Sequence, residues 1–250
     1  MIPRAWVPAA TGVVVIALLL AAWQALYAVA GDQAMTPPLE TFAYLGHLLT
    51  TDAFWGHLAE TGRAFGIALL LAVLLGLAIG LILGAHRFSA EVAEPMLVAF
   101  YSVPKITLYP IILLAFGLGL PAKIAFGTIH GIVPVAIFTL GAVRNINPIL
   151  LKTARVLHLR PWKVALSILL PAALPEIFTG IRLGFALTLI GTLLGEMFGS
   201  QRGLGYLLMT AIGLQNIQLI MAVTLLIVLF AASVSTLLMV IDHGLHRRVS

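Results

Sequence analysis

Long runs of apolar residues without a single charge dominate this chain. A membrane-spanning helix needs about 20 mostly apolar residues, because the hydrocarbon core is about 30 Å thick and a helix rises about 1.5 Å per residue. Residues 7–30 form the first such run, and Trp6, Trp23 and Tyr27 lie near its ends, where amphipathic rings prefer to sit. Runs of this kind predict spanning helices.

The composition excludes a soluble fold. Apolar residues make up 61% of the chain and charged residues 9%, whereas a soluble domain carries about 25% charged residues. The chain cannot cover a globule with polar groups, so its solvent is largely lipid. A soluble enzyme, a nucleic-acid reader and a disordered chain are thereby excluded. The net charge of +5 does not require nucleic acid, because membrane topology also concentrates basic residues on one side.

Six spans are predicted, which makes the chain an all-α membrane protein. The predicted spans cover residues 7–30, 64–85, 95–120, 124–143 and 177–195, and a sixth begins near Ile217. A polar cluster, Gln215 to Gln218, predicts a short helix and a loop before the sixth span. The predicted domains are residues 1–62 (the first span and an extracytoplasmic interfacial helix), 63–242 (a five-helix core) and 243–250 (a cytoplasmic tail).

Two features of the N-terminal part need interpretation. Arg4 before the first run and Ala28-Val29-Ala30 at its end are also typical of a signal peptide. Because the run is long enough to span, we expect an uncleaved helix. Further on, Thr36-Pro37-Pro38 predicts the start of a helix at the membrane interface.

The distribution of basic residues predicts that both termini face the cytoplasm. With a cytoplasmic N-terminus, the inside segments hold nine basic residues: Arg4, Arg87, Arg144, Lys152, Arg155, Arg160, Lys163, Arg247 and Arg248. The outside segments hold three, Arg63, Lys123 and Arg202, and two more lie within the spans.

A cytoplasmic loop, residues 144–175, follows the fourth span. Asn147 and Pro148 predict a helix start, since Asn caps and Pro at the first position loses no needed hydrogen bond. Pro161 predicts its end near Leu159. The helix carries an apolar stripe of Leu150, Ala154 and Leu157, with Lys152 and Arg155 beside it. So short a helix needs a groove, either in the same protein or in a cytoplasmic partner.

Several spaced motifs resemble the permeases of ATP-binding-cassette (ABC) importers. The sequences Lys152-Thr153-Ala154, His158 and Ile168-Leu169-Leu170-Pro171 have the spacing of the EAA loop of these permeases. Thr179 to Leu183, Gly195-Glu196-Met197 and Gly203 to Leu207 resemble the nitrate, sulfonate, taurine and bicarbonate branch. Where the family pattern has Glu, Ala and Gly, this chain has Lys152, Thr153 and His158. A His can adopt the left-handed backbone of the missing Gly at some cost.

The resemblance implies a type I importer permease fold in the inner (plasma) membrane, without chemistry of its own. The implied partners are a second permease copy in a homodimer, two cytoplasmic ATPase subunits and an extracytoplasmic substrate-binding protein. No G-x-x-x-x-G-K-[ST] occurs, so we expect no cofactor on this chain, with ATP and Mg²⁺ bound by the ATPase. The implied coupling residues are Pro148, Leu150, Lys152, Thr153, Ala154, Arg155, Leu157, His158, Pro161 and Pro171.

Ionisable groups within spans are costly and therefore candidates for function. We expect Lys105, Arg182, Glu196 and His130 to line a translocation pathway, where the two cations would favour a small anionic solute. Structural pairing with Glu176, Glu196 or free carbonyls is an equally open interpretation for both cations. Glu196 is more simply explained as orienting the loop after it, and His130 as a hydrogen-bonded structural residue.

Two other functions would each require a set of residues. A secondary transporter that works without an ATPase would need coupling-ion carboxylates near the midplane and usually inverted repeats. An intramembrane enzyme would need a clustered nucleophile and base or metal ligands. The sequence shows neither set, and no metal site is expected. A neutral or aromatic heterocyclic solute of the same branch stays an alternative to an anion.

Overall fold

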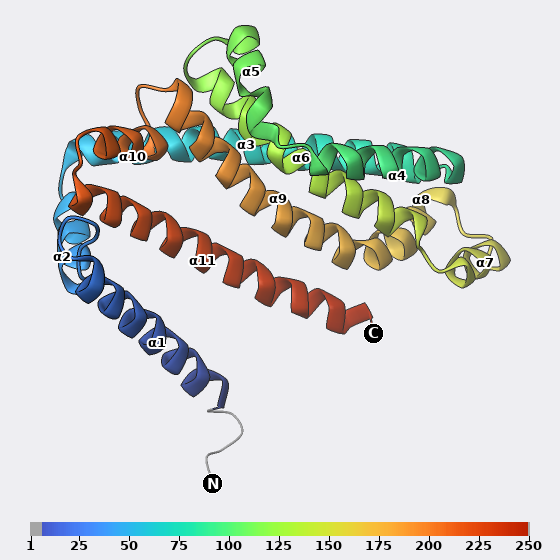
Figure 1. The fold of residues 1–250 in the computed structure, drawn as a ribbon. Coiled ribbons are helices and arrows are strands. Elements are labelled where there is room, and N and C mark those ends of the chain that lie inside the picture. Colours follow the sequence, from blue (N-terminus) through green and yellow to red (C-terminus); the bar gives the residue numbers. More distant parts are fainter. Residues whose placement is uncertain (1–6, 250) are drawn as a thin grey trace. The chain divides into compact units, whose positions relative to one another are not determined.

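The fold is entirely helical in the part of the chain that the structure describes. This structure is a computed structural model that describes the backbone of residues 7–249, and side chains from 11 to 245 apart from several positions between 151 and 166. The elements of Figure 1 are helices throughout that range. The predicted all-α class is therefore confirmed.

The chain forms two compact units. Unit 1 contains the described residues up to Gly56 together with 207–229, and unit 2 contains 57–206 and the described residues from Phe230. Three helices contribute to both units: α3 (Asp52–Gly84), α10 (Leu204–Gly213) and α11 (Ile217–Val249). The sequence did not indicate that 207–229 belong with the N-terminal part. The predicted division at residues 62 and 242 stays a prediction.

Unit 1 is built on α1 (Val7–Ala30) and α2 (Pro38–Leu48). The first span has its predicted bounds, and α2 begins at the predicted prolines, with Pro38 in its first turn. The indole N–H of Trp23 donates to the carbonyl of Thr36 at 3.0 Å, which ties α1 to the start of α2. A helix is thus present at the predicted place as α2, and its position at the membrane interface stays a prediction.

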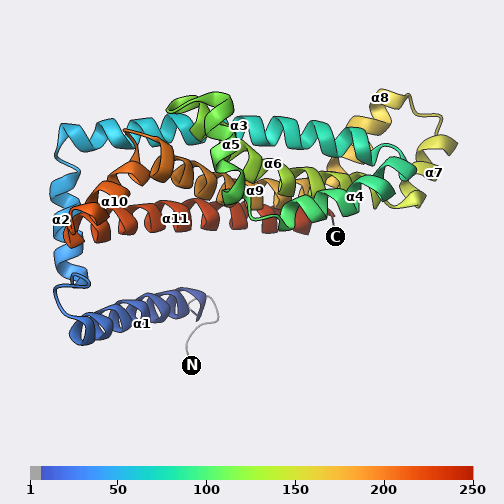
Figure 2. The same cartoon turned by 45° about the horizontal axis from the view of Figure 1, so that its top comes forward.

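Unit 2 is organised around one antiparallel pair, α6 (Leu120–Arg144) and α9 (Leu170–Gly199). The two helices pack side by side along most of their length, and α4 (Arg87–Ser102) packs against α6 (Figures 1 and 2). The start of α6 and the end of α9 form one end of the pair, called here the distal end. The loop that joins α6 to α9 lies at the opposite end.

Glycines allow α6 to approach two neighbours closely. On α3, Gly76, Gly80 and Gly84 face α6; a methyl group at Gly80 would lie 2.7 Å from the carbonyl oxygen of Ala136. On the other side, a methyl group at Gly184 of α9 would lie 2.7 Å from Val135. The α3 glycines therefore make an internal contact of the kind that small residues permit between membrane helices.

The third predicted span is not a straight helix. Five helices are long and apolar enough to cross a membrane, and a sixth crossing requires a pair bent by 85°: α4, then the 3-10 turn η1 (Lys105–Leu108) with α5 (Tyr109–Phe116). The bend follows from Pro104, because proline disfavours helical backbone in the residue before it. Val103 is accordingly extended, with ψ 130°. Six crossings require this broken span.

The second span differs in extent from the prediction, whereas the start of the sixth agrees with it. Helix α3 begins at Asp52, twelve residues before the predicted start at Ala64. Its 33 residues correspond to about 50 Å, which is longer than a hydrocarbon core of about 30 Å. The sixth span begins at Ile217 as predicted, after the short helix α10.

The glycine packing predicts that replacing a glycine of α3 by alanine destabilises the protein at one position and not at another. Gly80→Ala should lower the apparent unfolding temperature of the purified chain in detergent by about 3–10 °C, because overpacking costs about 1–3 kcal/mol. Gly66→Ala is the matched control, since nothing lies within 4 Å of its added methyl group. The control should be neutral or slightly stabilising; equal effects of both substitutions would contradict the packing.

Candidate functional site

The cytoplasmic loop contains the short helix that the sequence predicted. Helix α7 (Pro148–Val156) begins at Pro148, and the side-chain oxygen of Asn147 accepts a hydrogen bond from the Ile149 amide at 2.9 Å. This is the N-cap that Asn provides, with Pro at the first helical position. The predicted start of the helix is therefore confirmed.

The helix ends earlier than predicted, at Val156 instead of Leu159. His158 has a positive φ of 48°, and the Leu159 amide donates back to the carbonyl of Ala154 at 3.1 Å. This bond and the left-handed residue before it form a Schellman cap, in which glycine is usual. His158 thus adopts the geometry of the family's glycine, and the short helix α8 (Pro161–Val164) follows the turn.

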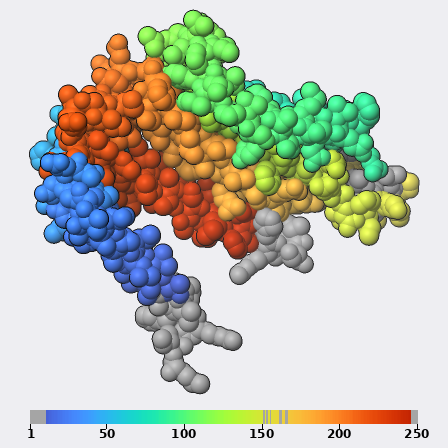
Figure 3. Space-filling model, in the orientation of Figure 1, coloured from blue at the N-terminus to red at the C-terminus, as the bar shows by residue number. Residues whose placement is uncertain are grey.

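The apolar stripe of α7 is divided between the interior and the surface. Ala154 is buried, whereas Leu150 is 38% and Leu157 61% exposed; Lys152 and His158 are exposed as well. Figure 3 shows this segment at the surface in yellow-green. The predicted side chains of Thr153, Arg155 and Pro161 lie outside those that the structure describes.

A π-helical turn, η2 (Ala165–Leu169), connects α8 to the start of α9. The exposed Pro171 lies in the first turn of α9, where the absence of an amide proton is tolerated. The loop therefore contains two short helices and a local irregularity before the long span. Irregular turns of this type are frequent at functional sites.

Lys105 lies at the break between α4 and α5 and is buried, with 8% of its surface exposed. Its ammonium group donates to the carbonyl of Tyr101 at 3.1 Å and lies 5.1 Å from the centre of the Tyr101 ring. Within the described residues, no carboxylate lies at ion-pair distance from it. The predicted contact with a free carbonyl is present, but the charge itself is not neutralised.

Arg182 has a partner that the sequence did not indicate. Its guanidinium group lies 3.6 Å from the carboxylate of Asp242 on α11, and Thr179 donates to the other oxygen of that carboxylate at 3.2 Å. Asp242 is buried at 6% exposure. Of the two open interpretations, structural pairing therefore applies to Arg182, but with Asp242 on α11 and not with Glu176 or Glu196, which helix rise carries along α9 away from it.

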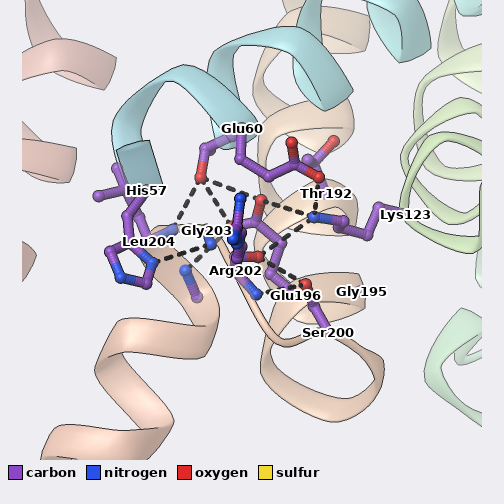
Figure 4. A network of polar contacts seen from close by, with 12 residues as sticks. His57, Glu60, Lys123, Thr192, Gly195, Glu196, Ser200, Arg202, Gly203 and Leu204 are labelled. Atoms are coloured by element: carbon purple, nitrogen blue, oxygen red, sulfur yellow. Dashed lines mark hydrogen bonds and ion pairs between the residues drawn. The ribbon is translucent and has the colours of Figure 1, made fainter. Parts of the chain in front are cut away.

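Glu196 belongs to a polar network at the distal end of the α6–α9 pair (Figure 4). It is fully buried and accepts hydrogen bonds from the Thr61 hydroxyl and from the Gly205 amide at 3.0 Å. Lys123, also fully buried, lies 2.8 Å from Glu60 and 3.8 Å from Glu196. The contact with Gly205 supports the expected role of Glu196 in orienting the following loop.

His130 is buried within α6, and one ring nitrogen is hydrogen-bonded to the carbonyl of Phe126 at 2.8 Å. The ring also packs edge-on against the Phe126 ring, with centroids 4.5 Å apart. These contacts support the structural interpretation of His130. The described contacts of the four predicted pathway residues are separate: Lys105 contacts Tyr101, His130 contacts Phe126, Arg182 pairs with Asp242, and Glu196 belongs to the distal network.

Sequence reasoning missed the partners of the network. Lys123 was counted only as an outside basic residue, and Glu60, Thr61 and Asp242 were not singled out. One signal was available in the sequence. Glu60, Lys123 and Asp242 each lie within a few turns of the end of a predicted span, and a charge of opposite sign lies near the end of another predicted span on the same membrane side. That signal does not identify which helices are neighbours.

Comparison with known proteins agrees with this architecture. The family model for the binding-protein-dependent transport system inner membrane component matches residues 72–250. A Haemophilus influenzae protein named as an ABC transporter permease is 31% identical over 93% of this chain and 94% of its own length. A Bacillus subtilis protein named for aliphatic sulfonates transport is 27% identical over 80% and 73%. Others are named for taurine, nitrate and bicarbonate transport.

A solved structure has the same fold. A chain of the MetNI methionine ABC transporter, in an inward-facing conformation, aligns with a TM-score of 0.61 and 21% identity, covering 77% of this chain and 94% of that chain. Long apolar helices make the chain a multi-span membrane protein, and the family match assigns it to the transport permeases. The chain belongs to the binding-protein-dependent transport system inner membrane component family, and it is the permease subunit of an ABC importer with the type I fold.

The Arg182–Asp242 pair predicts rescue by charge exchange. Arg182→Asp and Asp242→Arg should each reduce the yield of monodisperse chain and destabilise it by about 1–3 kcal/mol, because a partly buried charge loses its partner. The double variant should recover at least half of the loss in unfolding temperature. Exchange of the exposed pair Arg87 and Glu91 is the control and should change little. Additive losses in the double variant would remove the pair as the explanation for Arg182.

Proposed function

We propose that this chain forms half of the solute pathway of an ATP-driven importer for a small anion. The observation that carries the proposal is Lys105, a buried cation at the break of the third span without an ion-paired carboxylate in the described structure. An ionisable group retained within a span marks a solute path more often than a packing position. A break in a spanning helix is tolerated where it lines a water-filled cavity or is buried in protein.

Of the two intramembrane cations, Lys105 supports the proposal and Arg182 does not. Asp242 offsets the charge of Arg182, so Arg182 adds little to anion selectivity. The Lys105 ammonium has one carbonyl and aromatic faces around it, and an arriving anion would supply the missing counter-charge. The names of the similar proteins support this solute class, because sulfonates, nitrate and bicarbonate are anions and taurine carries a sulfonate.

The energy for transport is proposed to come from two cytoplasmic ATPase subunits that bind ATP and Mg²⁺. Helix α7 supports this proposal, because Leu150 and Leu157 expose apolar surface on a short helix that already has its own caps. Such a helix fits a hydrophobic groove of a partner. Ala154, in contrast, is buried within this chain and holds α7 in place.

The remaining assembly is proposed from the family and the charge pattern. A second copy of the chain would complete the pathway as a homodimer, and an extracytoplasmic binding protein would deliver the solute. The excess of basic residues in 144–163 supports a cytoplasmic position for the loop and for both termini. The distal end, with its Glu196 network, would then face the extracytoplasmic side, and the division at residues 62 and 242 would separate the added first span from the permease core.

The role of Lys105 is tested by uptake into proteoliposomes that contain the complete transporter. Lys105→Met should reduce uptake of labelled taurine, methanesulfonate, nitrate or bicarbonate, whichever the wild type transports, by about tenfold or more. Lys105→Arg should retain part of the activity because it keeps the charge. Arg182→Lys, which keeps the charge beside Asp242, is the matched control. Wild-type uptake by Lys105→Met, with the complex intact, would refute the proposed role.

The role of α7 is tested by co-purification of this chain with the ATPase subunit of the complete transporter. Leu150→Asp and Leu157→Asp should abolish co-purification while the spans still insert, because both side chains are exposed and the change does not disturb the interior. Glu91→Gln, in the exposed pair with Arg87 on α4 and outside the loop, is the control and should keep the complex. Undiminished association of both Asp variants would remove the docking role of the stripe.

A further inference from the structure

Side chains from three helices hold the backbone of four consecutive residues at the distal end. The carbonyl of Arg202 accepts from the Lys123 ammonium at 3.2 Å, and the Gly203 amide donates to the His57 ring at 3.2 Å. The Leu204 amide donates to the Thr61 hydroxyl at 2.8 Å, and the Gly205 amide to Glu196 at 3.0 Å. Residues 202–205 are thus bound through their backbone, as Figure 4 shows.

The side chains that bind this segment include three charges, and two of them are almost completely shielded from solvent. Lys123 and Glu196 are 1% and 0% exposed, and Glu60, at 25%, is the only one of the three that reaches solvent. Removing one charge from such a group leaves the others buried without compensation, which is more costly than the pair is stabilising. We call the side chains of Glu60, Thr61, Lys123 and Glu196 the distal latch.

The latch can bind residues 202–205 only because two of them, Gly203 and Gly205, have no side chain. Gly203 has a φ of 119°, a conformation that suits glycine, and a methyl group there would collide with the Glu196 carboxylate. At Gly205 an added methyl group would lie 2.8 Å from the Glu196 Cβ atom. The side chain of Arg202, in contrast, is exposed. The latch therefore contacts the backbone of this segment, and the side chain of Arg202 stays exposed at the surface.

The latch lies where the chain passes between the two units. The chain enters unit 2 at His57 and leaves it after Tyr206; it enters again at Phe230, within α11. The rings of His57 and Tyr206 are stacked with centroids 6.0 Å apart, and His57 also accepts from the Gly203 amide. Two of the three connecting segments, 57–61 and 202–206, are therefore fastened to each other and to the ends of α6 and α9 within unit 2.

We propose that Lys123 and Glu196 are positioning residues that fasten two of the three connections to unit 1, residues 57–61 and 202–206, onto the distal end of the α6–α9 pair. The latch keeps this end of unit 2 intact. It also holds the peptide bond between Arg202 and Gly203 on both sides, through the Arg202 carbonyl and the Gly203 amide. This role depends on geometry alone and is independent of the solute and of the ATPase.

Trypsin tests the latch, because Arg202 offers an exposed cleavage site whose peptide bond is held. In detergent, where both faces of the protein are accessible, the wild type should be cut slowly at this bond, since proteases need local opening. Lys123→Met should raise the rate of cleavage there at least about tenfold, because the latch loses its only cation. Mass spectrometry of the fragment that begins at Gly203 measures the rate.

Further variants separate an open latch from general unfolding. Glu60→Gln replaces the partly exposed member and should raise cleavage less than Lys123→Met does. Adding Glu60→Gln to Lys123→Met should lower the rate again, since one unpaired carboxylate is removed. Glu91→Gln, in the exposed pair with Arg87, is the matched control and should leave cleavage at Arg202 unchanged. A wild-type rate in Lys123→Met, or an equal increase at every Lys and Arg, would overturn the proposal.

Discussion

Close approach of α6 to α3 and α9 is the constraint on which the rest of unit 2 depends. Lipid tails are as apolar as leucine, so helices in a membrane are not held together by a hydrophobic effect between them; packing of small residues is a main source of association. Gly76 and Gly80 on one side and Gly184 on the other bring the backbones near enough for side chains of one helix to contact carbonyls of the next. Any larger residue at these positions would separate the helices.

This packing also determines which charged side chains are paired. At the distal end, the proximity of three helices allows Lys123 to meet Glu60 and Glu196, and α11 brings Asp242 to Arg182. Lys105 differs because the break at Pro104 turns it away from the regular helix pair, where only a carbonyl and aromatic rings meet it. In the described structure, the charges at the distal end and at Arg182 are therefore paired, whereas Lys105 at the broken span has no ion-paired carboxylate, which is why we propose it as the residue that recognises the solute.

Local signals in the sequence were reliable where chemistry acts within one turn. Asn147 and Pro148 predicted the start of α7, and the family spacing placed a turn at His158, whose positive φ the structure shows. The end of α7 was misplaced by three residues because the Schellman cap, and not Pro161, terminates it. The sequence placed the third span at residues 95–120 without its bend, because hydropathy reports how apolar a segment is and not its direction after a proline.

By itself, the sequence determined that the chain is a helical membrane protein, where its spans and loops lie, and which family it resembles. These properties depend on run length, charge and local capping, all of which act between neighbouring residues. Only the tertiary structure decided which charges meet, which face of α3 is internal and how sharply the third span bends. Those outcomes depend on contacts between residues as distant as Thr61 and Glu196, and a linear pattern of hydropathy contains no information about which helices become neighbours.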